Sequence, residues 1–332
     1  MRIGYLGAGA WGNCLVKLLA GNGHEVKHWL GNMSMDVALK RETEEVSSTE
    51  HLAQENRIFT PDLQEACSDV DLIIESVTSK GLRPVLEQMV QLGVAGPPIV
   101  LTSKGIEQGT GLLLSEVAVE VLGKEYKRKI GCLSGPSLAN EVNRKLPTSV
   151  VASAYDHDLM MLICDTFSTP YFRVYPNGDM PAISFGGAMK NIIAIACAIA
   201  DGLGFGENTK AALMTRGLHE IRKLGAVKGC SAETLNGLSG LGDLCATCLS
   251  TSSRNYKFGK YLAEGCTPDQ AREKVGMVVE GAYTCVSALE LAQKHAIDVP
   301  ITEAVHDMIY KGVNPREAVE ALLMRAVKQE HL

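Results

Sequence analysis

Short apolar runs alternate with helical stretches through the first half of the chain. Six runs, each bounded by glycine, proline or polar residues, predict strands; they are residues 1–7, 25–30, 70–77, 98–102, 129–133 and 149–153. The segments between them carry apolar residues at helical spacing, most clearly at 10–21, 81–93 and 111–122. Strands that alternate with helices are typical of a parallel sheet covered on both faces, so the pattern predicts an α/β domain.

The pattern changes after the turn YPNGD at residues 175–179. Beyond it the apolar spacing is helical and predicts no strand. The expected helices are residues 184–202, 208–225, 231–238, 254–264, 268–275, 280–295, 301–310 and 315–328. We therefore expect two domains, an α/β domain over residues 1–180 and an all-helical domain over residues 181–332.

One of these helices carries a lysine beside an unbroken apolar run. Residues 192–200 are all apolar, and Lys190 lies just before them. The pattern predicts a helix from Ala188 with Lys190 in its first turn, preceded by Gly186 and Gly187, which let backbone and ligand come close. Periodicity alone leaves two alternatives: a lysine whose amine reaches solvent at a helix end, or a charge placed inside the protein.

Composition narrows the class of protein. Apolar residues make up 46% and charged residues 21%, which is ordinary for a globular protein, and the formal net charge is −6. This charge argues against nucleic acid as a partner. No signal-peptide pattern opens the chain and no apolar run is long enough to predict an integral membrane segment. The ten cysteines have no framework spacing, so we expect reduced thiols in a cytoplasmic protein.

A glycine-rich turn follows the first predicted strand. Residues 7–12 read GAGAWG, which fits the pattern G-x-G-x-x-G. After a strand and at the start of a helix, this pattern is typical of dinucleotide-binding sites. Gly7 and Gly9 allow the tight turn and close approach of a pyrophosphate, and Gly12 allows close packing of helix on strand. The alternative is a plain glycine turn.

The second predicted strand lacks the usual selector between NAD and NADP. Neither a carboxylate for the ribose hydroxyls nor an arginine for the 2′-phosphate follows it. His28, Asn32 and Ser34 are the residues there that could hydrogen-bond a ribose. The cofactor is therefore expected to be NAD or NADP, without a preference.

Two further stretches end predicted strands and suit an anionic ligand. Lys104, in TSKG, follows the fourth strand, where ligands of open parallel sheets gather. Gly135 and Ser137, in SGPSLANE, follow the fifth. The structural alternatives are a solvated loop lysine for the first and a helix-capping sequence for the second.

The helical half carries a second group of polar candidates. Ser253, Arg254 and Asn255 combine a hydroxyl, a guanidinium and an amide at an expected helix start, a set that suits a phosphate. Asp243, in LSGLGDL, and Glu280, in VVEGAYT, are nearby carboxylates. The alternative is a capped surface helix with an exposed arginine.

Cys245 and Cys248 form a single C-x-x-C pair. No second pair and no suitably spaced histidines accompany it, so we expect no metal site here.

Taken together, these motifs resemble a known family, the NAD(P)-dependent glycerol-3-phosphate dehydrogenases of the bacterial type. The matching stretches occur in the family's order from end to end: GAGAWG, TSKG, SGPSLANE, GGAMKN, ADGLGFGENT, AALMTRGLHE, LSGLGDL, TSSRN and VVEGAYT. The resemblance implies a Rossmann-type domain followed by the helical domain of 6-phosphogluconate dehydrogenase relatives. It also implies a homodimer that supplies glycerol 3-phosphate for glycerophospholipid synthesis.

The resemblance assigns roles to individual residues. Lys190 matches the family's general acid/base. The positions that match contacts to the small phosphorylated substrate are Lys104, Gly135, Ser137, Lys190, Asp243, Ser253, Arg254 and Asn255. The positions that match cofactor contacts are Gly7, Gly9, Ala10, Trp11, Gly12, Lys104, Ala139, Arg254, Val278 and Glu280. The family often has an arginine where this chain has Gly31, which leaves the cofactor preference open.

The implied chemistry requires an amine that can lose its proton. An ordinary lysine titrates near pKa ~10.4, and burial or a second cation lowers this value. Lys190 offers the burial and Lys104 the cation. Two other hypotheses compete: a ketopantoate or 3-hydroxyacyl-CoA dehydrogenase of the same superfamily, and a dinucleotide sensor without catalysis. A sensor would need neither Lys190 nor Arg254.

Overall fold

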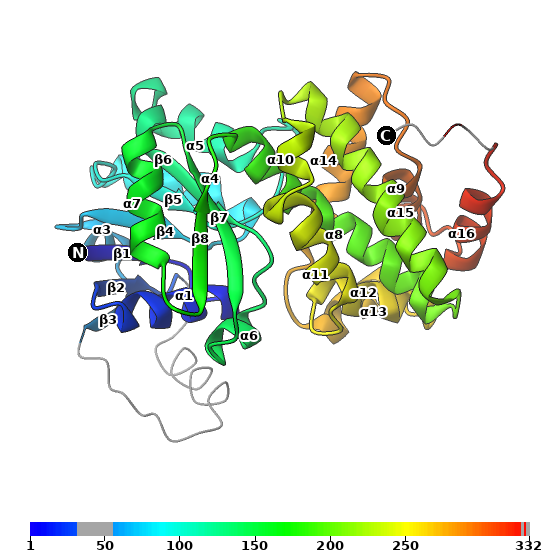
Figure 1. The fold of residues 1–332 in the computed structure, drawn as a ribbon, viewed down its shortest axis with the longest axis horizontal. Coiled ribbons are helices and arrows are strands. Elements are labelled where there is room, and N and C mark those ends of the chain that lie inside the picture. The colour runs from blue at the N-terminus through cyan, green and yellow to red at the C-terminus, as the bar shows by residue number, and fades with distance from the viewer. Residues whose placement is uncertain (32–55, 327–328, 330–332) are drawn as a thin grey trace. The chain divides into compact units, whose positions relative to one another are not determined.

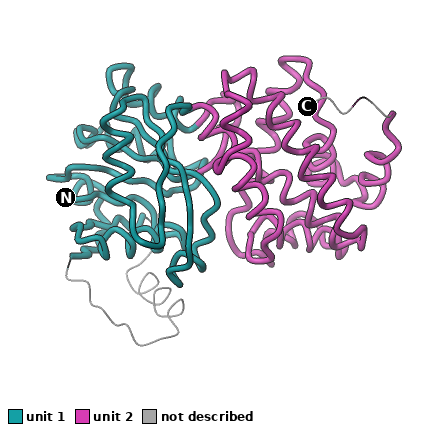
Figure 2. Tube along the Cα trace, in the orientation of Figure 1, with its two compact units in different colours: residues 1–103, 114–180 teal, residues 104–113, 181–332 magenta. Residues whose placement is uncertain are grey.

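A computed structural model describes residues 1–31, 56–326 and 329 of the chain. It divides into two compact units, shown in Figure 2. Unit 1 comprises residues 1–103 and 114–180, and unit 2 comprises residues 104–113 and 181–332. The segment 104–113 thus belongs to the helical unit although it lies within the α/β half of the sequence. Asn32 and Ser34 lie outside the described residues.

Unit 1 is built on one eight-stranded sheet (Figure 1). Its strands run in the order β3-β2-β1-β4-β5-β6-β7-β8. The strand order reverses between β1 and β4, where doubly wound sheets bind ligands at the carboxyl ends of their strands. The strands are β1 (Arg2–Leu6), β2 (Glu25–Trp29), β3 (Arg57–Thr60), β4 (Leu72–Glu75), β5 (Ile99–Leu101), β6 (Ile130–Ser134), β7 (Thr148–Ala154) and β8 (Phe172–Pro176).

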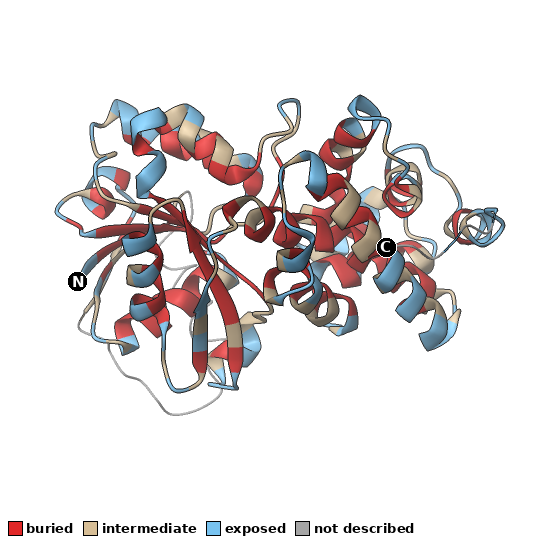
Figure 3. Cartoon of the chain, turned by 45° about the horizontal axis from the view of Figure 1, so that its top comes forward, coloured by how far each residue is buried: buried red, intermediate tan, exposed pale blue. Residues whose placement is uncertain are grey.

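Helices pack on this sheet through aliphatic side chains. One core includes Leu15 of α1, Ile163 of α7 and Ile74 of β4, all fully buried. Figure 3 shows the strands of the sheet coloured mostly as buried. The helical elements of unit 1 are α1 (Ala10–Gly21), α3 (Leu63–Cys67), α4 (Ser79–Gln91), α5 (Leu114–Leu122), the 3₁₀ helix η1 (Lys124–Lys129), α6 (Ala139–Asn143) and α7 (His157–Phe167). The predicted Rossmann-type α/β fold is confirmed.

The sheet differs from the prediction in two respects. β6 and β7 pair antiparallel, so the sheet is mixed rather than parallel. β3 and β8 were not predicted, and they form the two edges of the sheet. Edge strands contact only one neighbouring strand and need no continuous apolar run. β8 has the burial pattern of buried, exposed, half-buried, exposed, exposed along FRVYP, which explains why its apolar signal was weak.

Unit 2 is helical, and the predicted all-α domain class is confirmed. Its elements are α8 (Met180–Gly202), α9 (Gly206–Val227), α10 (Ala232–Leu235), the π-helical turn η2 (Leu238–Gly242), α11 (Asp243–Leu249), α12 (Arg254–Ala263), α13 (Pro268–Val275), α14 (Glu280–Lys294), α15 (Pro300–Tyr310) and α16 (Pro315–Leu323). η2 and α11 were not predicted because LSGLGDL is rich in glycine, which weakens a helical pattern.

The helix α8 is the centre of the unit 2 core. Residues 191–200 are all buried, which confirms the expected apolar core run. Among the described helices, α8 alone is long and apolar enough to cross a membrane by length and composition, but 94% of that apolar window is buried inside the protein. Such burial is typical of a helix at the centre of a hydrophobic core.

The start of α8 differs from the expectation. The helix begins at Met180, before both the expected range 184–202 and the expected start at Ala188, so Lys190 lies in the third turn and not in the first. Gly186 therefore sits inside the helix, where its missing side chain has a packing reason. A Cβ added at Gly186 would lie 2.8 Å from the carbonyl oxygen of Ser239, in η2. The glycine lets η2 approach the helix backbone closely.

Candidate active site

The glycine turn between β1 and α1 is closely packed against neighbouring atoms at Gly7 and Gly12, but not at Gly9. Gly7 has a φ of 117°, and a Cβ added there would lie 2.9 Å from Ser76. A Cβ at Gly12 would lie 2.3 Å from the carbonyl oxygen of Gly7, so only glycine allows α1 to start this close to the strand. A Cβ at Gly9 would meet no heavy atom within 4 Å, so the turn faces open space there.

Within the described residues, the first turn of α1 receives no capping side chain. Gly9, the N-cap, makes no side-chain capping hydrogen bond, and the turn contains no acidic residue. Gly9 and Ala10 are exposed and Trp11 is half-buried. Unsatisfied N–H groups and the helix dipole suit the pyrophosphate of a dinucleotide, so these residues fit the cofactor that the motif predicts.

His28 does not face a ribose site. Its side chain is fully buried in unit 1, and its Nε2 lies 2.9 Å from the carbonyl oxygen of Gly7. The ring also packs edge-on against Tyr5. His28 therefore stabilises the glycine turn through its bond to Gly7. The expectation that His28 could hydrogen-bond a ribose is wrong.

The candidates after β6 also lie in unit 1. Gly135 has a φ of 137°, and a Cβ there would lie 2.9 Å from the Cα of Val150. The Ser137 hydroxyl donates to the carbonyl oxygen of Gly135 at 3.0 Å. The N-cap of α6 is Leu138, so the serine shapes the loop and does not cap the helix. Ala139, the first residue of α6, lies beside α1, because its carbonyl oxygen accepts a hydrogen bond from Cys14.

Unit 2 contains a buried cluster of charged groups around Asp243, the first residue of α11. The Asp243 carboxylate accepts from Lys190 through Oδ1 at 2.5 Å and from Lys104 through Oδ2 at 2.6 Å. Lys190 also donates to the Thr247 hydroxyl at 2.8 Å. The Lys104 side chain is 18% exposed, while those of Lys190 and Asp243 are 10% and 2% exposed. One carboxylate is thus shared by two ammonium groups.

This environment changes the acidity of Lys190. Burial removes water from the ammonium and is the main cause that lowers the pKa of Lys190, to about 8. The Asp243 carboxylate partly offsets this by favouring the charged form, whereas the Lys104 ammonium lowers the pKa further. An amine with such a pKa exchanges protons readily near neutral pH, which suits a general acid or base.

Two neighbours of this cluster were missed in the sequence. Thr247 donates to the carbonyl oxygen of Asp243 at 2.7 Å, so its oxygen is oriented to accept from Lys190. Asn191, next to Lys190 in α8, is buried, and its Oδ1 accepts from Asn255 at 2.9 Å. Its Nδ2 makes no hydrogen bond within the described residues. Asp243 and Thr247 are four residues apart, so they share one face of a helix. Their pairing could not be inferred from the sequence because α11 was not predicted.

A second polar group forms where α12 and α14 begin. Ser253 is the N-cap of α12 and accepts from the backbone of Tyr256 at 3.4 Å, which confirms the predicted helix start. Asn255 accepts from the backbone N–H of Gly281 at 2.9 Å and so joins α12 to α14 and α8. Arg254 is exposed and donates to the carbonyl oxygen of Val278 at 3.2 Å.

The predicted site residues thus form groups within each unit. Unit 2 brings together Lys104, Lys190 and Asp243, and it places Ser253, Arg254, Asn255, Val278 and Glu280 around the starts of two helices. Unit 1 holds Gly7, Gly9, Ala10, Trp11, Gly12, Gly135, Ser137 and Ala139. In the described chain Cys245 and Cys248 are free thiols.

The sequence and the fold were compared with known proteins. The family model described as NAD-dependent glycerol-3-phosphate dehydrogenase N-terminus matches residues 2–160, and the corresponding C-terminus model matches residues 179–320. A protein of Protochlamydia amoebophila named glycerol-3-phosphate dehydrogenase, NAD(P)+, is 57% identical over 331 residues, which is 100% of this chain and 99% of that protein. One of the same name from Chlamydia pneumoniae is 52% identical with the same coverage.

A solved structure agrees with these matches. The crystal structure of glycerol-3-phosphate dehydrogenase from Coxiella burnetii superposes with a TM-score of 0.90 at 37% identity, covering 98% of this chain and 99% of that one. The family matches span both units, and the glycine turn and the Asp243 cluster are present in this chain. The chain belongs to the family of NAD-dependent glycerol-3-phosphate dehydrogenases.

Proposed function

We propose that this enzyme interconverts sn-glycerol 3-phosphate and dihydroxyacetone phosphate with NAD or NADP, and that Lys190 is its general acid/base. The family membership supports the overall reaction. One observation carries the assignment of Lys190: its buried amine, with a pKa lowered to about 8, is held by Asp243 and Thr247. A structural lysine would ordinarily keep its ammonium in solvent.

The proton balance of the reaction follows from this assignment. In the oxidative direction, neutral Lys190 takes the proton of the C2 hydroxyl while the C2 hydrogen leaves as hydride. The bound nicotinamide supplies the hydride acceptor at its C4. In the reductive direction, the Lys190 ammonium donates a proton to the carbonyl oxygen of dihydroxyacetone phosphate. Asp243 and Thr247 orient the amine, because both accept hydrogen bonds from it.

The remaining substrate contacts follow from charge and position. Arg254 is exposed at a helix start next to the buried amide of Asn255, a set that suits the phosphate group. Asn191 adds an amide donor beside Lys190. We assign to the same substrate Lys104, Gly135, Ser137, Asp243 and Ser253.

The cofactor contacts are proposed from the glycine turn and from the start of α14. Unsatisfied N–H groups of α1 suit the pyrophosphate. We assign to the cofactor Gly7, Gly9, Ala10, Trp11, Gly12, Lys104, Ala139, Arg254, Val278 and Glu280. Gly31, at φ 60°, supplies no guanidinium for a 2′-phosphate, so the preference between NAD and NADP stays open.

We further propose how the chain is organised and where it acts. Residues 1–180 would form the dinucleotide-binding domain and residues 181–332 the substrate-binding domain, with the individual contacts assigned above drawn from both. The protein would be a cytoplasmic homodimer whose product feeds glycerophospholipid synthesis. These assignments rest on the resemblance to the family, and gel filtration with light scattering tests the dimer.

A spectrophotometric assay tests the proposed function. Dihydroxyacetone phosphate is added to the enzyme with NADH or with NADPH, and loss of reduced nicotinamide is followed by absorbance. We expect oxidation with at least one cofactor, and much slower oxidation with dihydroxyacetone, which lacks the phosphate. A protein that binds cofactor but oxidises neither with dihydroxyacetone phosphate would be a sensor and would refute the proposal. Equal rates with and without the phosphate would refute the role of Arg254.

A further inference from the structure

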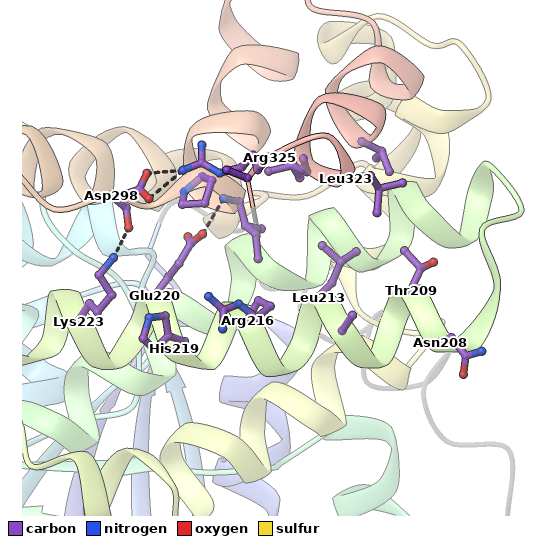
Figure 4. Close-up of a pocket in the computed structure, with 16 residues that line it drawn as sticks. Asn208, Thr209, Leu213, Arg216, His219, Glu220, Lys223, Asp298, Leu323 and Arg325 are labelled. Carbon is purple, nitrogen blue, oxygen red and sulfur yellow. Dashed lines mark hydrogen bonds and ion pairs between the residues drawn. The ribbon is translucent and has the colours of Figure 1, made fainter. Parts of the chain in front are cut away.

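Unit 2 contains a cavity that shares no residue with the Lys190 cluster. It has a volume of about 640 Å³ and lies between α9, α15 and α16. Figure 4 shows that its lining residues separate by character. One end, here called the cationic end, is lined by Arg216, His219, Lys223 and Arg325, together with the acids Glu220 and Asp298. The other, here called the leucine end, is lined by Leu213 and Leu323, with the polar Asn208 and Thr209 beside them. Val319 and Leu322 also line the cavity.

The two acids of the cavity are already engaged. Glu220 accepts from the backbone N–H groups of Ile301 and Thr302 at 2.6 and 3.0 Å, and from the Thr302 hydroxyl at 2.8 Å. Asp298 accepts from Arg325 through both carboxylate oxygens, at 2.9 and 2.8 Å. Asp298 is thus paired with Arg325, and Glu220 is held by the start of α15, although the positive charge of Lys223 acts on it.

Two of the cations, Arg216 and Lys223, form no direct ion pair within the described residues. Arg216 makes no hydrogen bond or ion pair within the described residues. Lys223 donates to a backbone carbonyl, that of Asp298, at 2.5 Å, which satisfies one donor without cancelling the charge. Burial lowers the pKa of His219, and the positive charges of Arg216, Lys223 and Arg222 lower it further. The cationic end thus offers Arg216 and Lys223 as charged donors that an anion could pair with.

The leucine end offers partly exposed apolar surface. Leu323 is 64% exposed although it lines the cavity, and Leu213 and Leu322 are half-buried. Ala212, also in the lining, is exposed. Covering such side chains removes apolar surface from water and is therefore favourable. The volume is in the range of about 300–1,000 Å³ that holds small-molecule ligands.

We propose that this cavity binds a single-chain amphiphilic anion, with its carboxylate or phosphate head at the cationic end and its hydrocarbon chain along the leucine end. Arg216 and Lys223 supply the charge-assisted donors for the head group. A small inorganic anion would leave the leucines uncovered, and a neutral hydrocarbon would leave the cations unpaired. The site does not depend on the proposed function, because none of its residues belongs to the catalytic or cofactor groups.

Isothermal titration calorimetry with dodecanoate, below its micellar concentration, tests the site on the full chain. We expect saturable binding of dodecanoate and none of dodecyltrimethylammonium or acetate at the same concentrations. Because a hydrogen bond to a charged group contributes up to a few kcal/mol, Arg216→Gln should weaken dodecanoate binding about tenfold. Leu323→Gln should weaken it about threefold through lost apolar contact.

Matched variants separate this site from general surface binding. Lys257→Gln removes a positive charge at an exposed position of α12, and Met324→Gln replaces a side chain that follows Leu323 and is 87% exposed; neither residue lines the cavity. Both variants should bind dodecanoate like the parent. Absence of dodecanoate binding, equal binding of dodecyltrimethylammonium, or equal losses in the control and cavity variants would each overturn the proposal.

Discussion

Lys190 is a buried amine whose proton affinity is set by three opposing effects. Burial lowers its pKa, the Asp243 carboxylate raises it, and the Lys104 ammonium lowers it again. Burial is the largest of these, so the outcome is a pKa of about 8 rather than the value above 10 of a solvated lysine. The same residue can therefore give or take a proton according to the direction of the reaction.

This pKa predicts opposite pH dependences for the two directions. Reduction of dihydroxyacetone phosphate needs the protonated amine, so its kcat/KM should fall as pH rises through about 8. Oxidation of glycerol 3-phosphate needs the neutral amine, so its kcat/KM should rise through the same pH. Initial rates of both reactions are measured across pH 6–10, which is roughly two pH units on either side of the pKa of Lys190. Limbs that move in the same direction would contradict the role of Lys190.

Lys104 should influence the pH at which kcat/KM for the reduction falls. Lys104→Met removes a positive charge that lowers the pKa of Lys190, so the limb should move to higher pH. The measurement is the pH profile of kcat/KM in the reductive direction. Lys257→Met, at an exposed position of α12, is the matched control and should leave the profile unchanged. A shift of the limb to lower pH in Lys104→Met would contradict this electrostatic explanation.

At the residue scale, the sequence indicated which charged residues belong to the site but not the neutral residues that contact them. Lys190 was found because a charge next to nine apolar residues is unusual, and Arg254 because it follows a capping serine. Thr247 and Asn191 were missed, since a threonine or asparagine within a helix carries no such signal. Their contacts depend on how α8, α11 and α12 pack, which periodicity does not specify.

At the scale of elements, the start of α15 is stabilised from another helix. Its N-cap, Val299, makes no side-chain capping hydrogen bond. The Glu220 carboxylate of α9 takes that role by accepting from Ile301 and Thr302. Burial raises the pKa of Glu220 to about 7, and these donors partly offset the effect. The carboxylate is retained in the core because it satisfies N–H groups that would otherwise be unpaired.

Glu220→Gln should therefore destabilise the fold. The new amide would place an NH₂ group against one of the N–H donors, which costs about 1–3 kcal/mol. Urea unfolding measures the change in free energy of unfolding. Glu303→Gln, exposed in the first turn of α15, should change it by less than about 0.5 kcal/mol. Similar losses in both variants would show that Glu220 has no special capping role.

Gly186 connects the packing of α8 to the position of Asp243. A Cβ at Gly186 would press on Ser239 and Gly240 of η2, and η2 leads directly into Asp243. Gly186→Ala should lower stability by about 1–3 kcal/mol, as overpacking does. It should also lower kcat, because Asp243 is displaced.

The control for this substitution is Gly178→Ala, where an added Cβ meets no heavy atom within 4 Å. Thermal unfolding and kcat are measured for both variants. Unchanged stability and kcat in Gly186→Ala would show that the close approach has no functional consequence.

The elements that the sequence predicted are those with a strong apolar period. The central strands and the long helices of unit 2 were found, several with ends within one or two residues of those observed. The edge strands β3 and β8 and the glycine-rich turn η2 were missed, since each depends on contacts with segments distant in sequence. The antiparallel pairing of β7 was likewise not encoded in its own residues.

At the scale of the whole molecule, the functional groups are divided between two cores. The glycine turn that suits the cofactor lies in unit 1, and the Lys190 cluster lies in unit 2. Lys104 follows strand β5 in sequence but belongs to unit 2. The proposed chemistry therefore predicts that a substitution of Lys190 lowers kcat strongly and leaves cofactor binding at the glycine turn unchanged.

The most direct test is a paired measurement on Lys190→Ala. The kcat for reduction of dihydroxyacetone phosphate is measured alongside the Kd for NADH or NADPH. If Lys190 is the general acid, kcat should fall by about 10²–10⁴-fold, while the Kd for the cofactor should change by less than about threefold, because the glycine turn lies in the other unit. A variant that keeps near-normal kcat would show that another group transfers the proton and would contradict the assignment of Lys190.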